Sequence, residues 1–280
     1  MDSLVSTEWL AKEIGASDLR IVDASWHMPD TGRDANTEFE QGHIPGAVFL
    51  DLAALVDSAS PIDNTMPSAE KFASRMQSLG LGDDSRIVLY DDSAIKTSAR
   101  GWFMFKLFGA HQVAILDGGL AKWKLEGRVL AEGRETPRHC HFTARSDAGK
   151  LRSKADVLRN LGERSEQLVD ARGPGRFTGE EPEPRPGMAS GHIPGARNVP
   201  IGSLFNADGT YKDKSALKTA ITSGGVDLAK PLVTSCGSGM TACVLAFALH
   251  RIGKTDVALY DGSWSEWGAD PDTPKALGPA

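Results

Sequence analysis

Residues 42–55 read GHIPGAVFLDLAAL, and residues 191–204 read GHIPGARNVPIGSL. Two further pairs keep the same order along the chain: RIVDAS at 20–25 with QLVDAR at 167–172, and LDGGLAKW at 116–123 with YDGSWSEW at 260–267. The spacing between partners drifts by only a few residues, as expected for two copies of one domain that differ by loop insertions. We therefore predict an N-terminal domain over 1–135, a linker over 136–149 and a C-terminal domain over 150–280.

Each copy alternates short β-branched runs with longer helical patterns. Buried parallel strands are predicted at RIVLYDD, VAILDGG, PLVTS and VALYDG. Helices are predicted at TEWLAKEIG, SAEKFASRMQSLG, SARGWFMFKLFGA and TACVLAFALHRIG. This order indicates an α/β fold in which each domain is an open, mainly parallel sheet flanked by helices, with ligands at the carboxyl ends of the strands.

Composition narrows the classes of function. The 280 residues are 40% hydrophobic and 24% charged, with a formal net charge of −6. An acidic chain without a Lys/Arg-rich run is not expected to bind nucleic acid. No apolar run is long enough to cross a membrane and the N-terminus lacks a secretory pattern, so a cytoplasmic location is expected. Three irregularly spaced cysteines indicate free thiols in a reducing compartment.

One of these cysteines lies at a predicted strand end, in TSCGSGMTA at 234–242. Gly237 and Gly239 allow backbone amides to crowd around Cys236, and the following helix adds partial positive charge, so a thiolate is stabilised there. Cys236 is therefore the candidate nucleophile, whereas Cys243, within the apolar helix, is expected in the core. A phosphatase is disfavoured because the loop ends in Ala242 and not in a phosphate-binding arginine.

Metal and phosphate sites find little support. The chain has no Walker-type phosphate loop and no cysteine pair at zinc spacing. His139, Cys140 and His141 are adjacent in the linker, without a fourth ligand nearby in sequence. No metal and no organic cofactor is predicted.

The paired GHIPGA motifs, the DGG/DGS-W signatures and a cysteine loop in the second copy only resemble tandem rhodanese-like sulfurtransferases over nearly the whole chain. Asp91 and Asp92 are aligned with Ser235 and Cys236, so the first domain is expected to be catalytically silent. Within the family, CGSGMTA resembles the loop of enzymes that use 3-mercaptopyruvate, with Met240 at the place of a usual valine. Loops of the thiosulfate-specific members are basic.

The resemblance implies further site residues. Arg176 and Arg185, in RFTGEEPEPR, correspond to the two arginines that bind the substrate carboxylate. From the residues alone these arginines could equally pair with Glu180, Glu181 or Glu183. The loop residues Gly237, Gly239, Met240 and Thr241 are expected to contact the substrate.

A weaker expectation concerns the first domain. The resemblance implies that Asp34 and His43 act as a relay with Ser238. The sequence also allows a bracing role, because His192 occupies the same GHIPGA context in the other copy. Asp23 and Asp170, at the ends of paired strands, are expected to be structural.

The resulting functional hypothesis is transfer of sulfur from 3-mercaptopyruvate through a Cys236 persulfide, with release of pyruvate. Small thiols, thioredoxin and cyanide are the expected acceptors. Two alternatives stay open: a thiosulfate:cyanide sulfurtransferase, and a persulfide carrier that receives sulfur from partner proteins.

Overall fold

The computed structural model describes residues 1–280 and divides into two compact units. The first unit comprises residues 1–57, 66–147 and 206–210, and the second comprises 58–65, 148–205 and 211–280. Residues 136–147 therefore pack with the first unit. Phe142, for example, lies edge-on to Phe72 at 5.6 Å between ring centroids.

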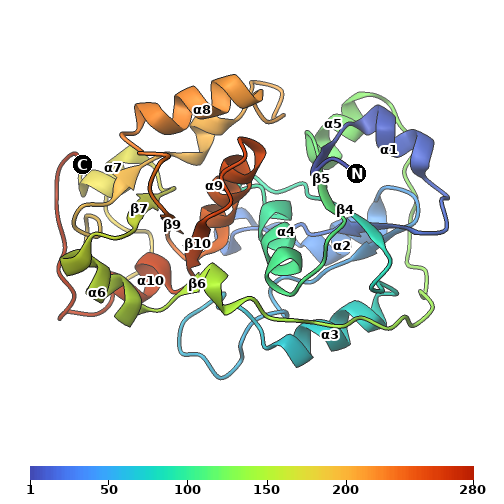
Figure 1. Ribbon diagram of the computed structural model, residues 1–280. Coiled ribbons are helices and arrows are strands. Elements are labelled where there is room, and N and C mark those ends of the chain that lie inside the picture. The colour runs from blue at the N-terminus through green and yellow to red at the C-terminus, as the bar shows by residue number, and fades with distance from the viewer. The chain divides into compact units, whose positions relative to one another are not determined.

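The first unit is built on a five-stranded parallel sheet with the order β1-β5-β4-β2-β3 (Figure 1). Its elements are β1 (Leu4–Val5), α1 (Thr7–Glu13), β2 (Leu19–Asp23), η1 (Pro29–Thr31), α2 (Ala35–Gln41), β3 (Ala47–Phe49), α3 (Ala69–Ser78), β4 (Arg86–Tyr90), α4 (Ser98–Leu107), β5 (Val113–Leu116) and α5 (Gly119–Leu125).

The second unit repeats this plan, with the strand order β6-β10-β9-β7-β8 and parallel pairing throughout. Its elements are η2 (Ala148–Lys150), β6 (Leu151–Arg152), α6 (Lys154–Glu163), β7 (Gln167–Asp170), α7 (Pro174–Thr178), β8 (Arg197–Asn198), η3 (Ile201–Leu204), α8 (Lys214–Ser223), β9 (Leu232–Ser235), α9 (Met240–Arg251), β10 (Val257–Tyr260) and α10 (Ser263–Trp267). The predicted α/β class, with two copies of one open parallel sheet, is confirmed.

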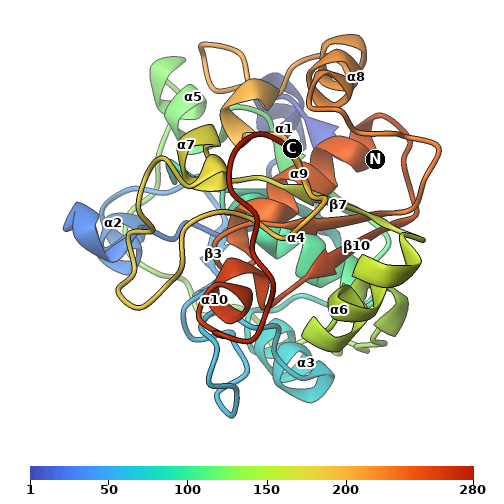
Figure 2. The same cartoon turned by 90° about the vertical axis from the view of Figure 1, so that its left-hand side faces the viewer.

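Helices cover both faces of the second sheet. Val157 of α6, Phe177 of α7 and Trp264 of α10 pack in one buried cluster with strand residues such as Val233 and Ala258. α9 packs on β9 and β10 and also contacts α8. Figures 1 and 2 show α8 and α10 on opposite sides of the sheet. Both faces of the strands are therefore buried, which explains their continuous apolar character.

Strand register fixes how the two copies correspond. β2 pairs Asp23 with Tyr90, and β7 pairs Asp170 with Ser235. Asp91 is thus the counterpart of Cys236, and the sequence alignment that placed Asp92 there is one residue out. The reason is loop length, because the segment that follows runs to Ser98 before α4 begins but only to Met240 before α9 begins.

The turn before α10 holds an unusual backbone. Ser263 has a φ of 50°, in the left-handed region, where its counterpart Gly119 has a φ of 58°. A residue with a Cβ is strained in this region. The Ser263 hydroxyl, however, accepts the Cys236 N–H at 3.1 Å and donates to the Tyr260 carbonyl at 2.8 Å. The serine hydroxyl thus provides a hydrogen-bond acceptor for the buried Cys236 N–H, which a glycine at this position could not do.

Substitution of Ser263 should separate strain from hydrogen bonding. Ser263→Ala keeps the strained φ and loses the acceptor, whereas Ser263→Gly loses both. We expect both variants to be destabilised by loss of the acceptor, and Ser263→Gly to unfold with a free energy about 1 kcal/mol higher than Ser263→Ala. Urea denaturation of the two variants measures the difference. Equal stability of the two would show that the left-handed backbone carries no strain.

A second prediction concerns Asp23, which is 2% exposed and accepts the Ser25 N–H at 2.8 Å. Burial raises the pKa of Asp23 from 3.8 to about 6. Its stabilising contribution is complete below pH 3.8, where folded and unfolded chains are both protonated, and is lost as the pH rises through 6. The rise in pKa corresponds to about 3 kcal/mol. Asparagine does not titrate. The change in the free energy of unfolding caused by Asp23→Asn should therefore be more favourable at pH 8 than at pH 4, by up to about 3 kcal/mol.

The matched control is Asp170→Asn, because Asp170 faces the Arg172 guanidinium at 2.7 Å. Loss of that carboxylate leaves a buried arginine without its partner, so this variant should be destabilised at pH 8. Urea denaturation at both pH values tests the pair. An Asp23→Asn effect that is the same at pH 4 and pH 8 would contradict the prediction.

Candidate active site at the carboxyl edge of the second sheet

Cys236 lies immediately after β9 and four residues before α9 begins. It is 1% exposed and free of any disulfide. The loop can close so tightly because Gly239, the N-cap of α9, has a φ of 75°. The thiol is thus at a strand end beside the N-terminus of α9.

Three hydrogen bonds from backbone N–H groups fasten this loop to α10. The Cys236 carbonyl accepts the Trp264 N–H at 3.0 Å, and the Gly237 carbonyl accepts the Ser265 N–H at 2.8 Å. The third bond is the one between the Cys236 N–H and Ser263 described above. The first turn of α10 therefore fixes the backbone on both sides of the nucleophile.

In the first unit, an aspartate stands at the place that corresponds to Cys236. Asp91, the counterpart of Cys236, is buried and accepts the Ser93 N–H at 2.8 Å through one carboxylate oxygen. Its other oxygen accepts the N–H of Ser98, the first residue of α4, at 2.9 Å. The same fold thus surrounds a side-chain acceptor with backbone donors at this point of the sheet. Cys236 occupies the same place at the end of β9.

Arg176, in α7, lies over the cysteine loop. A Cβ at Gly237 would come within 3.1 Å of the Arg176 Nη2 atom, so the guanidinium approaches the loop as closely as it does only because glycine stands there. Arg176 also donates to Glu183 at 2.5 Å, yet 29% of its side chain is exposed. Its Nη1 atom has no protein acceptor and is free to bind a ligand.

Arg185 reaches the same loop through a hydroxyl. Its Nη1 atom donates to Ser265 Oγ at 2.5 Å, and that hydroxyl donates to the Gly237 carbonyl at 2.7 Å. The side chain is 38% exposed, with Asp63 at 3.9 Å. The structure therefore brings both predicted arginines to Gly237, next to Cys236.

Buried charges behind Arg176 were not predicted. Arg172 contacts Asp170 at 2.7 Å and Glu183 at 2.6 Å, its guanidinium lies 4.4 Å from the Trp264 ring centroid, and its side chain is 1% exposed. Burial lowers the pKa of Arg172, but the two carboxylates outweigh burial and the net pKa is raised. Glu183 thus joins the buried Arg172 to the partly exposed Arg176, which fixes the position of the latter.

Arg176 therefore does pair with a glutamate of its loop, Glu183, and its role in substrate binding stays a prediction. A local signal for this pairing existed in the spacing of acidic and basic residues in RFTGEEPEPR. Glu183 could not be chosen over Glu180 and Glu181 before the fold was known, because it is the fold that turns Glu183 inward, with a side chain 2% exposed.

The other loop residues lie as expected around the cysteine. Ser238 is half-buried within the loop, and Met240 and Thr241 open α9. Cys243 is fully buried and contacts the Gly239 carbonyl with its sulfur at 3.2 Å, in agreement with its predicted place in the core.

His43 and Asp34 lie in the first unit and are not joined by a hydrogen bond. His43 is 3% exposed, stacks on Phe39 at 4.1 Å and bonds the Phe39 carbonyl through Nδ1 at 2.8 Å. Asp34 caps α2 by accepting the Thr37 N–H at 2.6 Å. His192 of the second unit is held in the same way as His43, by Phe177. This repeated geometry is that of a brace, and the relay with Ser238 stays a prediction.

Two further observations describe the whole chain. No group of three or more histidine, cysteine, aspartate or glutamate side chains is arranged to hold a metal ion. None of the helices combines the length and the apolar character that a membrane span requires.

Comparison with known proteins places this geometry in a family. The model of the rhodanese-like domain matches residues 6–126 and 153–270. The 3-mercaptopyruvate sulfurtransferase of Homo sapiens is 42% identical over 271 residues, which cover 95% of this chain and 91% of that protein. The thiosulfate sulfurtransferase of Bos taurus is 40% identical over 280 residues, covering 97% and 94%.

A comparison with solved structures gives the same family. The 3-mercaptopyruvate sulfurtransferase SseA from Escherichia coli superposes with a TM-score of 0.86 at 38% identity, covering 95% of this chain and all of that one. The chain therefore belongs to the rhodanese-like family and is a sulfurtransferase with two such domains.

Proposed function

We propose that the enzyme takes its sulfur from 3-mercaptopyruvate and passes it on through a persulfide on Cys236. The observation that carries this proposal is the convergence of Arg176 and Arg185 on Gly237, beside the buried thiol. Two guanidinium groups next to a neutral loop suit a donor that carries one carboxylate some distance from its sulfur. The similarity to 3-mercaptopyruvate sulfurtransferases supports the same donor.

The first half-reaction forms one bond and breaks one. The Cys236 thiolate attacks the sulfur of 3-mercaptopyruvate, the new S–S bond forms, and the C–S bond breaks with its electron pair passing to the carbon. The resulting enolate takes up a proton and leaves as pyruvate. Arg176 and Arg185 hold the carboxylate and the adjacent carbonyl, where negative charge develops. Loop amides from Gly237 to Thr241 stabilise the persulfide that remains.

The second half-reaction returns the enzyme to its starting state. A thiolate, or cyanide, attacks the outer sulfur of the persulfide and the S–S bond breaks, which restores the Cys236 thiolate. Small thiols and thioredoxin fit this step because it asks only for a nucleophile with access to the loop. The proposed chemistry needs no metal and no organic cofactor.

Thiosulfate is the second candidate donor, because thiosulfate sulfurtransferases are also 40% identical to the chain. Thiosulfate carries two negative charges close to the transferred sulfur. The segment from Gly237 to Thr241 contains no basic side chain to meet them. We therefore expect thiosulfate to be the poorer donor.

Steady-state transfer to one thiol acceptor tests the choice of donor. We expect kcat/KM for 3-mercaptopyruvate to exceed that for thiosulfate by at least about tenfold, which equals roughly 1.4 kcal/mol of transition-state stabilisation. Cys236→Ser should abolish transfer from both donors, and Cys140→Ser should transfer normally. A preference for thiosulfate would reject the proposed donor, and a persulfide without steady pyruvate release would favour a carrier.

The arginine pair has a sharper test. Arg176→Ala and Arg185→Ala should each lower kcat/KM for 3-mercaptopyruvate by about tenfold to a hundredfold, since each removes a charge-assisted hydrogen bond. The loss should fall mainly on KM. Arg159→Ala is the matched control, because Arg159 is an exposed arginine of α6 in the same unit. An unchanged KM in both site variants would show that these arginines do not bind the substrate.

A further inference from the structure

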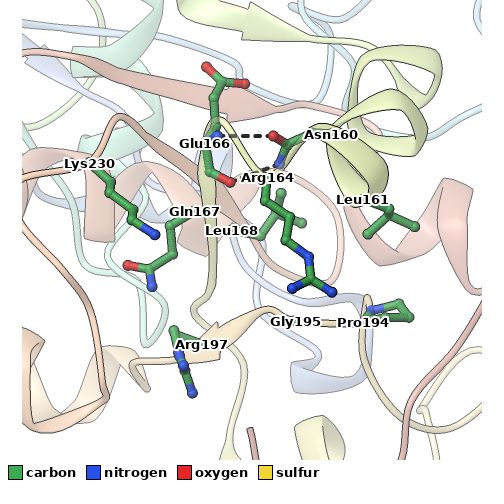
Figure 3. A pocket seen from close by; sticks show the side chains of 10 residues that line it. All are labelled: Asn160, Leu161, Arg164, Glu166, Gln167, Leu168, Pro194, Gly195, Arg197 and Lys230. Carbon is green, nitrogen blue, oxygen red and sulfur yellow. Dashed lines mark hydrogen bonds between the residues drawn. The ribbon is translucent and has the colours of Figure 1, made fainter.

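The second unit has a cavity of about 400 Å³ at the edge of its sheet opposite to Cys236. Gln167, the first residue of β7, lies in its wall, and Lys230 lies two residues before β9 begins. Cys236 follows the other end of β9. The cavity is therefore separate from the cysteine site. Its lining residues are Asn160, Leu161, Arg164, Glu166, Gln167, Leu168, Pro194, Gly195, Arg197 and Lys230 (Figure 3).

Three cations line this cavity. Figure 3 shows Lys230 and Arg164 on two sides of it, with Arg197 below Gln167. None of the three side chains has a hydrogen bond or an ion pair with the protein. Glu166 is the single acid in the lining, and its carboxylate is taken by Arg152 at 2.6 Å. The cavity thus has an excess of positive charge in a chain whose net charge is −6.

Arg197 carries an unsatisfied donor. Its Nε atom is buried and has no hydrogen-bond partner. The guanidinium lies against the chain at Gly225, where an added Cβ would meet Arg197 atoms at 3.3 to 3.7 Å. A buried donor without an acceptor costs free energy, so this N–H would be stabilised by an acceptor supplied from outside the chain.

The fold itself does not require these cations. In the repeated GHIPGA motif, the residue at the place of Arg197 is Val48 in the first unit. Strand register likewise aligns Ile87 with Leu232, so Ser85 is the counterpart of Lys230. The same sheet edge folds in the first unit with neither cation. The sheet edge therefore forms without Arg197 and Lys230, whereas Arg164 and Lys230 are exposed and Arg197 is half-buried.

We propose that this cavity binds a small organic phosphate. Two planar guanidinium groups and one ammonium group supply the donors that phosphate oxygens prefer. Leu161, Leu168 and Pro194 offer apolar contact to the organic part of such a molecule. A volume of about 400 Å³ suits a small molecule.

Hydrogen bonds hold the rim of the cavity in place. Asn160 accepts the Glu166 N–H at 2.9 Å and donates to the Glu166 carbonyl at 2.8 Å, and Gln167 accepts the Asp227 N–H at 2.8 Å. These bonds hold the segments that carry Arg164 and Lys230. Because these segments are already ordered, a ligand that binds here would lose little free energy to ordering the backbone.

Calorimetric titration of the full-length enzyme tests this site. The probes are inorganic phosphate, glucose 6-phosphate and adenosine monophosphate, with glucose and adenosine as uncharged controls, all at one ionic strength. We expect at least one phosphate ester to bind saturably and its uncharged counterpart not to bind. Arg197→Val with Lys230→Ser, which copies the first unit, should weaken that binding about tenfold or more.

The matched control is Lys214→Ala with Lys218→Ala, which removes two exposed charges from α8 of the same unit and should leave the affinity unchanged. Sulfur transfer should be normal in both double variants, so failure of this proposal is distinct from failure of the proposed function. If the first double variant does not fold, Arg164→Asn replaces it, because the φ of 53° at Arg164 is tolerated by asparagine.

Three results would overturn the proposal. The first is that no phosphate ester binds the wild-type enzyme. The second is that the α8 control weakens binding as much as the cavity variant, which would indicate general electrostatic attraction. The third is that a glutamate-rich peptide binds through Arg197 and Lys230 while the phosphate esters do not.

Discussion

The active-site geometry depends on the hydrogen bonds between the cysteine loop and the first turn of α10. A strand end in a parallel sheet leaves backbone groups that must find partners, and here Ser263, Trp264 and Ser265 supply them in sequence. The same contacts place the two reactive features together. Ser265 holds the Gly237 carbonyl with its N–H and hydroxyl and accepts from Arg185, so the thiol and the Arg185 guanidinium are positioned by one helical turn.

The two units show how one backbone carries different chemistry. At the end of β2, Asp23 faces Ser25 and has a raised pKa, whereas Asp170 at the end of β7 faces Arg172. That arginine continues through Glu183 to Arg176. The difference between VDAS and VDAR thus separates a buried carboxylate without a cationic partner from the start of a charge network that ends at Arg176.

Much of this architecture could be predicted from the sequence, because the repeated motifs recur in the same order and each apolar run has a length typical of one element. Cys236 was predicted from the glycine spacing of its loop and from the family resemblance, whereas Arg176 and Arg185 were predicted from the resemblance alone. Glu183 and Ser263 were not found. Which of three glutamates turns inward depends on tertiary packing, and a serine with a left-handed φ has no local signature. The one-residue error at Asp91 arose where loop length differs between the copies.

The two edges of the second sheet are used differently. At the carboxyl edge the two partly exposed arginines each have a protein partner: Arg176 is held by Glu183 and Arg185 by Ser265. Such tethering fixes the guanidinium groups before a substrate arrives, which lowers the entropic cost of binding. At the amino edge Arg164, Arg197 and Lys230 have no protein partner, and one donor is buried without an acceptor. In the two proposals made above, the preorganised cations hold an anion that is turned over, and the partnerless cations hold an anion that only binds.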